Sequence, residues 1–179
     1  MSDNDFEKLC AVDSNLRFEM DSDGQVNLNP FVDPISSHRR FNLIGRVGSW
    51  IEATHIGVGA DGSACFTLPN GAKRSPSLSW IRQDRWDALT PRQRNEFTHI
   101  CPDFVIELRS KTDRLKPLQN KMSEYIENGA QLGWLIDPSQ GKVHIYRPDK
   151  AVEILEQPTE ISGEEVLPGF MLKLAGILD

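Results

Sequence analysis

The run from Asp103 to Arg109 places charged residues among apolar ones. If it is a β-strand, Asp103, Glu107 and Arg109 lie on one face, and the other face is entirely apolar. Because burying an unpaired charge is costly, such a face either forms ion pairs or holds a metal. Two convergent carboxylates suit a hard cation such as Mg²⁺. In the alternative, Asp103 ends the strand in solvent and Glu107 pairs with Arg109 or Lys121.

Lys121 is a second candidate for chemistry. It precedes Tyr125 by four residues, so in a helix the two share a face. A right-handed crossover after the strand would lay this helix on the sheet, where the amine can reach Glu107. A lysine there can orient an attacking water or stabilise charge on a phosphate. The alternative is a surface lysine whose aliphatic stem covers Tyr125.

Basic residues are concentrated between the strand and this helix. The net charge of the whole chain is −6, which argues against a protein whose entire surface binds nucleic acid. A local basic strip on an acidic protein can nevertheless steer a phosphate backbone to one cleft. The alternative is a solvated loop and helix face. The candidate phosphate-binding residues are Arg109, Lys111, Arg114 and Lys116.

Hydrophobic periodicity predicts the elements before this strand. Period-two alternation in 16–20 and 25–28, around an Asp-Gly turn, predicts a β-hairpin. Apolar residues at spacings of three and four predict a helix over 36–53, with Ser36 or Ser37 as its N-cap. Residues 64–82 predict two strands around Asn70-Gly71. A helical tendency follows over 83–97, with Pro91 in a first turn.

The elements after the strand follow the same logic. A helix is predicted over 117–128, ending at Gly129. Strands are predicted over 132–136 and 143–146, with an edge strand over 152–155. A strand, a helix and a strand within about 35 residues form a βαβ-sized unit, so we expect a mixed sheet with helices packed on it.

The bulk composition indicates one globular domain spanning residues 1–179, with residues 1–15 loosely attached. No apolar run approaches the ~20 residues needed to span a bilayer. The acidic start of the chain is not a secretion signal, and we expect a cytoplasmic protein. The three scattered cysteines agree, and we interpret them as buried small hydrophobic residues: Cys10, Cys65 and Cys101.

Other constellations carry little chemistry. The histidines have no metal-ligand spacing, so solvated or hydrogen-bonded side chains are favoured at His38, His55, His99 and His144. The glycine-rich run 57–62 lacks a phosphate-loop lysine, and we interpret it as a loop before a strand. Trp134 lies in an apolar strand, which favours core or dimer packing over base stacking.

Three segments resemble the Uma-type restriction-endonuclease family, which is grouped with the PD-(D/E)XK nuclease superfamily. They are Pro102–Ser110, Lys121–Gly129 and Gly133–Pro138. The resemblance extends from about Leu16 to Leu167-Pro168-Gly169-Phe170, and so covers nearly the whole chain. It implies an α/β fold with a restriction-endonuclease-like core: a mixed central sheet flanked by helices, preceded by an N-terminal β-hairpin. It also implies Mg²⁺- or Mn²⁺-dependent cleavage of DNA and a homodimer.

The resemblance assigns roles to individual residues. Glu107 matches the glutamate of the (D/E)XK element, and Arg109 stands where the superfamily has its lysine. Lys121 looks like the replacement for that lysine, and Asp103 matches an aspartate at the start of the same strand. The implied catalytic residues are therefore Glu107, Lys121 and Asp103, of which Glu107 and Asp103 would hold the metal.

Two positions depart from the family pattern. The family has Pro-Asp on the preceding strand, whereas this chain has Pro76-Ser77. Family members also tend to carry a glutamate on the first helix, at a place that aligns with Asn42. Because Mg²⁺ affinity depends on the charge and number of its ligands, a site that lacks these carboxylates should bind metal weakly.

Three functions remain open on these grounds. We expect foremost a Mg²⁺-dependent endonuclease with a partly degenerate site. The alternative is a catalytically inactive paralogue that acts as a DNA-binding or protein-interaction module, which Ser77 favours. A purely structural oligomer subunit is also compatible with the acidic net charge.

Overall fold

A six-stranded mixed sheet forms the centre of the computed structural model, which describes residues 1–12, 16–29 and 31–179. Its strand order is β10-β9-β8-β7-β6-β3. Only β7 and β8 run parallel, because the helix α5 connects them. The strands are β3 (Gly57–Asp61), β6 (Leu78–Arg82), β7 (Phe104–Leu108), β8 (Leu132–Asp137), β9 (Lys142–Tyr146) and β10 (Glu153–Glu156).

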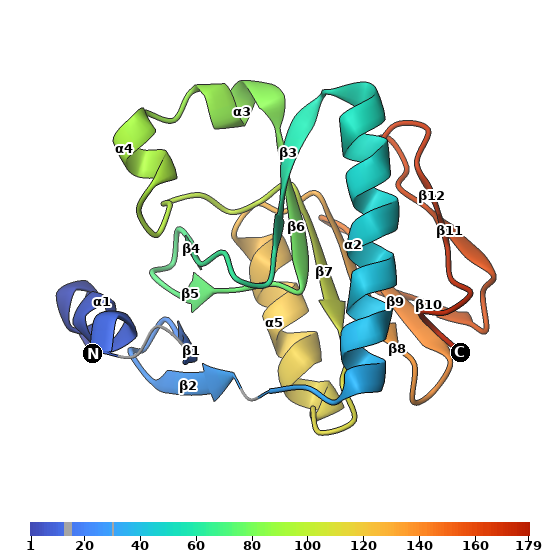
Figure 1. Cartoon of the computed structure of the whole chain (residues 1–179), viewed down its shortest axis with the longest axis horizontal. Helices are drawn as coiled ribbons and strands as arrows, with labels where there is room; N and C mark the ends of the chain where they lie inside the picture. The colour runs from blue at the N-terminus through green and yellow to red at the C-terminus, as the bar shows by residue number, and fades with distance from the viewer. Residues whose placement is uncertain (13–15, 30) are drawn as a thin grey trace.

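Two long helices, α2 (Pro34–Thr54) and α5 (Leu115–Glu127), run alongside this sheet (Figure 1). Alternation along β7 shows that they cover opposite faces. Phe104 and Ile106 pack in a core with Leu43 of α2, whereas Val105 packs in a second core with Met122 of α5. Both faces of β7 are therefore buried, as expected for a strand at the centre of a sheet between two helical layers.

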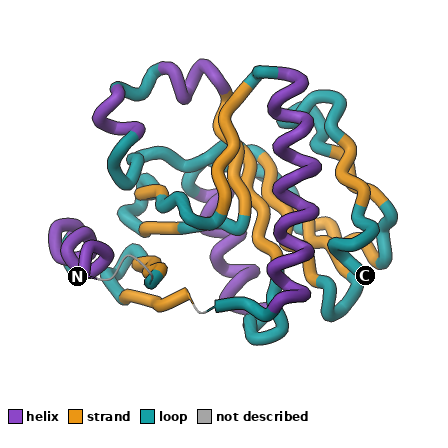
Figure 2. Tube along the Cα trace, viewed as in Figure 1, coloured by secondary structure: helices purple, strands orange, loops and turns teal. Residues whose placement is uncertain are grey.

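Smaller elements surround this core (Figure 2). A second sheet has the order β2-β1-β5-β4, and β11 pairs with β12. The remaining helices are short. These elements are α1 (Asp3–Val12), β1 (Arg17–Met20), β2 (Val26–Asn29), β4 (Phe66–Thr67), β5 (Lys73–Arg74), α3 (Gln83–Asp87), α4 (Pro91–Arg94), β11 (Glu160–Ser162) and β12 (Met171–Lys173).

Most of the predicted elements are confirmed. The hairpin β1–β2 is antiparallel, and α2, β7, α5, β8 and β9 lie within a few residues of the predicted ranges. The predicted edge strand is β10, which ends the sheet order. Gly129 follows α5 with a positive φ of 113°, a conformation that glycine tolerates and that ends the helix.

Two element predictions are wrong, and a third is confirmed only in part. The N-cap of α2 is Asp33, whose side chain accepts hydrogen bonds from the backbone N–H groups of Ile35 and Ser36. The predicted second strand of 64–82 is broken around Pro76, which lacks an N–H donor, so β5 and β6 belong to different sheets. The helical region 83–97 divides into two short helices, α3 and α4, and α4 begins at Pro91 as predicted, with a capping box formed by Thr90.

The glycine-rich run 57–62 is also not simply a loop, because it contains β3. A Cβ atom on Gly57 would lie 2.3 Å from Nε1 of Trp80, and one on Gly59 would lie 2.6 Å from Cδ1 of Ile51. Glycine therefore lets these large side chains pack directly on the strand. This close packing has no counterpart in hydrophobic periodicity, which explains why the strand was not predicted.

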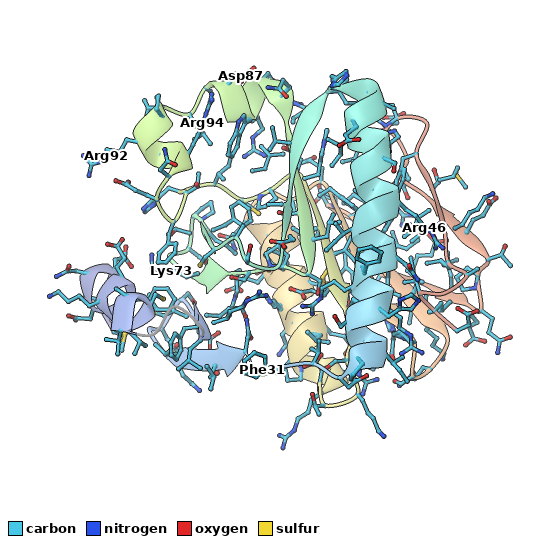
Figure 3. The ribbon with its side chains drawn as sticks, viewed as in Figure 1. Phe31, Arg46, Lys73, Asp87, Arg92 and Arg94 are labelled. Carbon is cyan, nitrogen blue, oxygen red and sulfur yellow. The ribbon has the colours of Figure 1, made fainter. Side chains whose placement is uncertain are left out.

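The N-terminal segment is held by specific contacts in its described part, 1–12. Phe6 of α1 is fully buried and forms an edge-to-face pair with Phe97, 5.9 Å between ring centroids. Lys73 of β5 lies between α1 and the rest of the molecule (Figure 3), and its amine is 3.3 Å from the Asp3 carboxylate. The predicted loose attachment of residues 13–15 lies outside the described residues. No helix in the described ranges is long and apolar enough to cross a membrane.

Candidate functional site

Lys121 lies between two buried carboxylates. Its Nζ atom is 2.7 Å from Oε1 of Glu107 and 2.7 Å from Oε1 of Glu19. The three residues come from α5, β7 and β1, which are far apart in the chain. The structure thus brings together Glu107 and Lys121, as the sequence predicts, and adds a second carboxylate.

The βαβ unit explains how Glu107 and Lys121 meet. Glu107 lies on the face of β7 that α5 covers, next to Val105 of the same face. One helical turn after Lys121, the Tyr125 hydroxyl donates a hydrogen bond to Oε1 of Glu107 at 3.3 Å. The alternation of the strand and the i, i+4 spacing of the helix are therefore sufficient to build this pair.

Ser77 lies beside Glu107, at the residue before β6. Its hydroxyl donates to Oε2 of Glu107 at 3.3 Å and accepts a hydrogen bond from the backbone N–H of Leu108 at 3.1 Å. Ser77 and Glu107 are each 5% exposed. The position that the resemblance assigns to a metal-binding aspartate is therefore adjacent to Glu107, and here it holds a neutral hydroxyl.

Glu19 was not predicted as a site residue. It is 5% exposed, and its Oε1 atom accepts a hydrogen bond from the backbone N–H of Ser75 at 2.6 Å. Alternation along the hairpin predicts a strand but does not show that this carboxylate faces Lys121, 102 residues away. Its role depends on β1 pairing with β5, a contact between distant parts of the chain. A glutamate within a predicted strand is at most a weak signal.

Burial governs the protonation of these groups. Desolvation raises the pKa of Glu107 despite the opposing effect of the Lys121 ammonium. Burial alone would lower the pKa of Lys121, but the carboxylates of Glu107 and Glu19 outweigh it and hold the pKa above its usual range. Burial and the nearby Glu107 carboxylate raise the pKa of Tyr125, so its hydroxyl stays protonated. Lys121 is therefore a permanent internal cation.

This network opens into a small pocket of about 110 Å³. Glu107, Ser77 and Lys121 line it, and two arginines, Arg17 of β1 and Arg40 of α2, line it as well. Ser110 and Asp113, from the loop between β7 and α5, complete one side. The pocket therefore combines a floor of paired charges with additional cationic groups.

Asp103 lies apart from this pocket. It is 5% exposed, and its carboxylate accepts a hydrogen bond from the backbone N–H of Arg82 at 2.9 Å and pairs with Arg85 at 2.8 Å. It precedes β7, whereas Glu107 is near the end of that strand. The structure thus does not bring the two predicted metal ligands together, since four residues of extended chain separate them by roughly 13 Å.

The Arg109 guanidinium is engaged within the fold. Its Nη1 atom is 2.7 Å from the fully buried Asp137 carboxylate and 3.0 Å from the Ser139 hydroxyl, and its Nε donates to the Asp113 carbonyl. It does not line the pocket. Of the two alternative partners predicted for Glu107, the structure therefore has Lys121 and not Arg109. The Arg109 guanidinium instead connects the loop after β7 to the end of β8.

Asn42 also lies outside the pocket. Its side-chain amide donates to the carbonyl of Gly176 at 2.9 Å, so it connects α2 to the C-terminal segment. Arg40, two residues earlier on α2, is the residue that reaches the pocket. The alignment of Asn42 with a metal-binding glutamate is therefore not matched by its position, and the second carboxylate near Lys121 comes from Glu19 on β1 instead.

The other predicted phosphate-binding residues are exposed. Lys111, Arg114 and Lys116 surround the start of α5 and flank Ser110 and Asp113 of the pocket. A helix N-terminus carries partial positive charge, so these side chains add to a field that already favours anions. They are therefore exposed cations close in the chain to the Ser110 and Asp113 side of the pocket.

The donor set does not fit a divalent metal. Among the described residues, no three His, Cys, Asp or Glu side chains form a group able to hold a metal ion. One carboxylate oxygen each of Glu107 and Glu19 already binds the Lys121 ammonium, which takes the position between them that a cation would need. Ser77 contributes only a weak neutral ligand, and Mg²⁺ depends on anionic oxygen ligands. Entry of Mg²⁺ would require displacing a buried lysine.

Comparison with known proteins agrees with this fold. No curated protein matches the chain. A crystal structure from Anabaena variabilis ATCC 29413, described as "a putative nuclease belonging to DUF820", is 20% identical in sequence and superposes with a TM-score of 0.77. The match covers 90% of this chain and 89% of the other, which confirms the predicted nuclease-like α/β fold. A family model described as "Uma2: Putative restriction endonuclease" matches residues 3–175, so the chain belongs to the Uma2 family.

Proposed function

We propose that this protein binds the phosphate backbone of DNA at the Glu107–Lys121 pocket without cleaving it through a divalent metal. The observation that carries the proposal is the Lys121 ammonium, held between Glu19 and Glu107 beside a serine. The family description and the nuclease fold support DNA as the ligand.

The basic rim of the pocket supports backbone binding. We define the rim as Arg17 and Arg40, which line the pocket, together with the exposed residues of the adjoining loop and first turn of α5, Lys111, Arg114 and Lys116. Positively charged side chains around a pocket neutralise phosphates and release counterions, which gives affinity independent of base sequence. The whole chain, with these five cations included, has a net charge of −6, so the rest of the protein is acidic and the attraction is confined to one region.

The floor of the pocket is compatible with an approaching phosphate. Two free carboxylates would repel it, but the Lys121 ammonium compensates one of the two negative charges. The cations of the rim then make the electrostatic potential at the pocket positive. Phosphate contacts of this kind position a protein on DNA but do not read its sequence.

The test is a salt series of binding to a fluorescein-labelled DNA duplex of random sequence, followed by anisotropy. Each phosphate contact contributes about 0.9 to the slope of log affinity against log salt. The variant Lys111→Ala/Arg114→Ala/Lys116→Ala should therefore bind more weakly and have a slope shallower by about 2 to 3. The control Lys142→Ala/Lys150→Ala/Lys173→Ala, in the C-terminal part, removes the same net charge away from the rim.

Equal loss of binding in both triple variants would contradict the proposal, because binding would then reflect net charge alone. Absence of binding by the unmodified protein at low salt would contradict it as well. Homodimer formation, which the family resemblance implies, stays a prediction that light scattering can check alongside.

A Mg²⁺- or Mn²⁺-dependent endonuclease is the second candidate. Glu107 and Lys121 favour it, because the resemblance assigns both to catalysis and the structure brings them together. Nicking of supercoiled plasmid in Mn²⁺ that disappears in Glu107→Gln would establish this candidate. Intact plasmid at protein concentrations that saturate the duplex favours binding without cleavage.

A further inference from the structure

The strand β3 forms a free edge of the six-stranded sheet. It lies at one end of the strand order and, among the described residues, pairs only with β6. The Gln83 N–H donates to the Ile56 carbonyl at 3.0 Å, so Ile56 belongs to a hydrogen-bonded pair of the ladder. Because such pairs alternate along antiparallel strands, the N–H and C=O groups of Gly57 and Gly59 point away from β6. Gly57 is buried, whereas Gly59 is exposed, so the groups of Gly59 are the ones available to a further strand.

The two edges of the sheet differ in chemistry. At the other end, β10 carries Glu153 and Glu156, each in an ion pair with a residue on or next to β9. Charged side chains blunt an edge against further pairing. The five residues of β3 carry one charge, at Asp61, and two of them are glycines. The β3 edge therefore lacks the protection that β10 has.

A groove follows each face of β3. A groove of about 830 Å³ lies on the face of Val58 and Ala60, between α1, β4 and the α3–α4 region. A second groove of about 240 Å³ lies on the face of Gly59 and Asp61, against α2. Side chains of a β-strand point alternately to the two faces of a sheet. A strand added to β3 would therefore place successive side chains in the two grooves.

The first groove fits large apolar side chains. Its walls include Phe66, Ile81, Trp86 and Phe97. Its two arginines already have partners: Arg94 lies over the Trp86 ring at 5.3 Å and near Asp87, and Arg92 pairs with Glu96 at 2.6 Å. Figure 3 shows Arg94 directed toward α3, whereas Arg92 points outward from α4. With the arginine charges compensated, this aromatic and aliphatic wall favours an apolar occupant, whereas Glu7 of α1 and several polar residues line the rest of the groove.

The second groove fits a lysine or an arginine. Its walls include Ile44, Val47, Ile51 and Leu78, and its acidic residues are Glu52 and Asp61. A lysine or arginine side chain can lay its aliphatic stem on apolar surface while its charged end reaches a carboxylate. The two grooves thus select different side chains on alternate positions.

A second copy of β3 would fill neither groove. Self-pairing would offer Val58 and Ala60 to one groove and glycine to the other, against volumes of about 830 and 240 Å³. We propose that the β3 edge binds an extended peptide segment of a partner protein, in which large apolar residues alternate with lysine or arginine. Backbone hydrogen bonds to the edge supply affinity, and the two grooves supply specificity.

The probe is a fluorescein-labelled peptide, Thr-Trp-Lys-Trp-Lys-Trp-Thr, followed by anisotropy. One matched peptide has the same composition in blocks, Thr-Trp-Trp-Trp-Lys-Lys-Thr. Two further peptides keep the alternating sequence, one with backbone N-methyl groups on the lysines and the other with them on the tryptophans. Together they block hydrogen bonding to β3 in either strand register. We expect saturable binding of the alternating peptide. Block order and the blocking N-methylation should each weaken binding about tenfold, since backbone hydrogen bonds or groove contacts are lost.

Variants of the protein separate groove contacts from general attraction between an acidic protein and a basic peptide. Glu52→Lys reverses the charge at the second groove, and Glu127→Lys makes the same change at an exposed position of α5. Only Glu52→Lys should weaken binding strongly. Ala60→Trp should fill the first groove, with Ala151→Trp, on an exposed turn, as its control.

Equal binding of all the peptides, or equal effects of Glu52→Lys and Glu127→Lys, would overturn the proposal. A protein dimer in light scattering that dissociates when the alternating peptide is added would assign the edge to a second copy of the chain instead, and would also overturn it. None of these outcomes depends on DNA binding at the Glu107–Lys121 pocket.

Discussion

Lys121 joins three elements through two short ion pairs. Removing one partner of a buried ion pair leaves an uncompensated charge, which costs more than the pair itself contributes. Lys121 is 13% exposed in its side chain, and the carboxylates of Glu107 and Glu19 are still less exposed. The stability of the fold is therefore sensitive to substitution of Lys121 alone.

The variant Lys121→Met keeps most of the side-chain volume but removes the ammonium. It should lower the free energy of unfolding by about 3 to 5 kcal/mol, because Glu19 and Glu107 lose their shared counter-charge. Urea denaturation at pH 7 measures this. Lys116→Met, on the exposed side of the same helix, should change stability by no more than about 0.5 kcal/mol. Equal stability of the two variants would mean that the ion pairs contribute little.

Ser77 is the position that distinguishes a metal site from an ion-pair network. Ser77→Asp should create a Mn²⁺ site detectable by calorimetry, because a second carboxylate would lie beside Glu107. Ser77→Asn has nearly the same size without the charge and should bind no Mn²⁺. If Ser77→Asp also shows no binding, the geometry around Glu107 is not that of a metal site that has lost one ligand.

Glu107 gives stability a specific pH dependence. Burial raises its pKa above the ordinary value of 4.5. Between pH 4.5 and the raised value, the folded state holds a proton that the unfolded state has released. Stability from this group is therefore present below pH 4.5 and is lost as the pH rises. The difference in unfolding free energy between the unmodified protein and Glu107→Gln should fall from pH 4.5 to 7.5. A difference that grows over this range would show that the folded protein lowers the pKa.

At the scale of elements, periodicity predicted what is local. The strand β7 and the helix α5 each have a hydrophobic pattern of their own, so Glu107 and Lys121 were placed together correctly. The position of Ser77 followed from the resemblance. Glu19 was missed because its burial depends on pairing between β1 and β5, over fifty residues apart. Contacts of this kind leave no periodic signal in either segment.

The pockets along β3 and the placement of Asp103 were missed for related reasons. Alternation correctly gives Asp103 and Glu107 the same parity, but it does not show that the strand's length separates them. The glycines of β3 interrupt the alternating apolar pattern by which a strand is predicted, because they are required for the side chains that pack on them and contribute no side chain themselves. A single sequence therefore predicts helices and strands more readily than it predicts which side chains contact one another.

Gly57 provides a test of this packing. Gly57→Ala should destabilise the protein by about 1 to 3 kcal/mol, because the added Cβ meets the Trp80 ring and the Ile81 carbonyl. Gly45→Ala is the matched change on an exposed helix position with no neighbouring atoms within 4 Å, and it should stabilise by up to about 1 kcal/mol. Thermal unfolding compares the two. Similar effects of both substitutions would contradict the close packing of β3 on β6.

At the scale of the whole molecule, charge is distributed unevenly. The basic rim gathers around one pocket of a chain whose net charge is −6. Long-range repulsion from the acidic remainder limits nucleic-acid contact to this region and makes it sensitive to salt. A metal-dependent nuclease would instead gain affinity for DNA phosphate when the metal binds, because the ion bridges the carboxylates and the phosphate.

One measurement separates these accounts directly. The labelled duplex is titrated with protein in EDTA, in Mg²⁺ and in Mn²⁺ at constant ionic strength, and the DNA from each sample is then examined on a denaturing gel. We predict equal affinity in all three conditions, intact DNA, and weaker binding by the Lys111→Ala/Arg114→Ala/Lys116→Ala variant in each. Binding that requires the divalent ion, or cleavage that Glu107→Gln abolishes, would contradict the account.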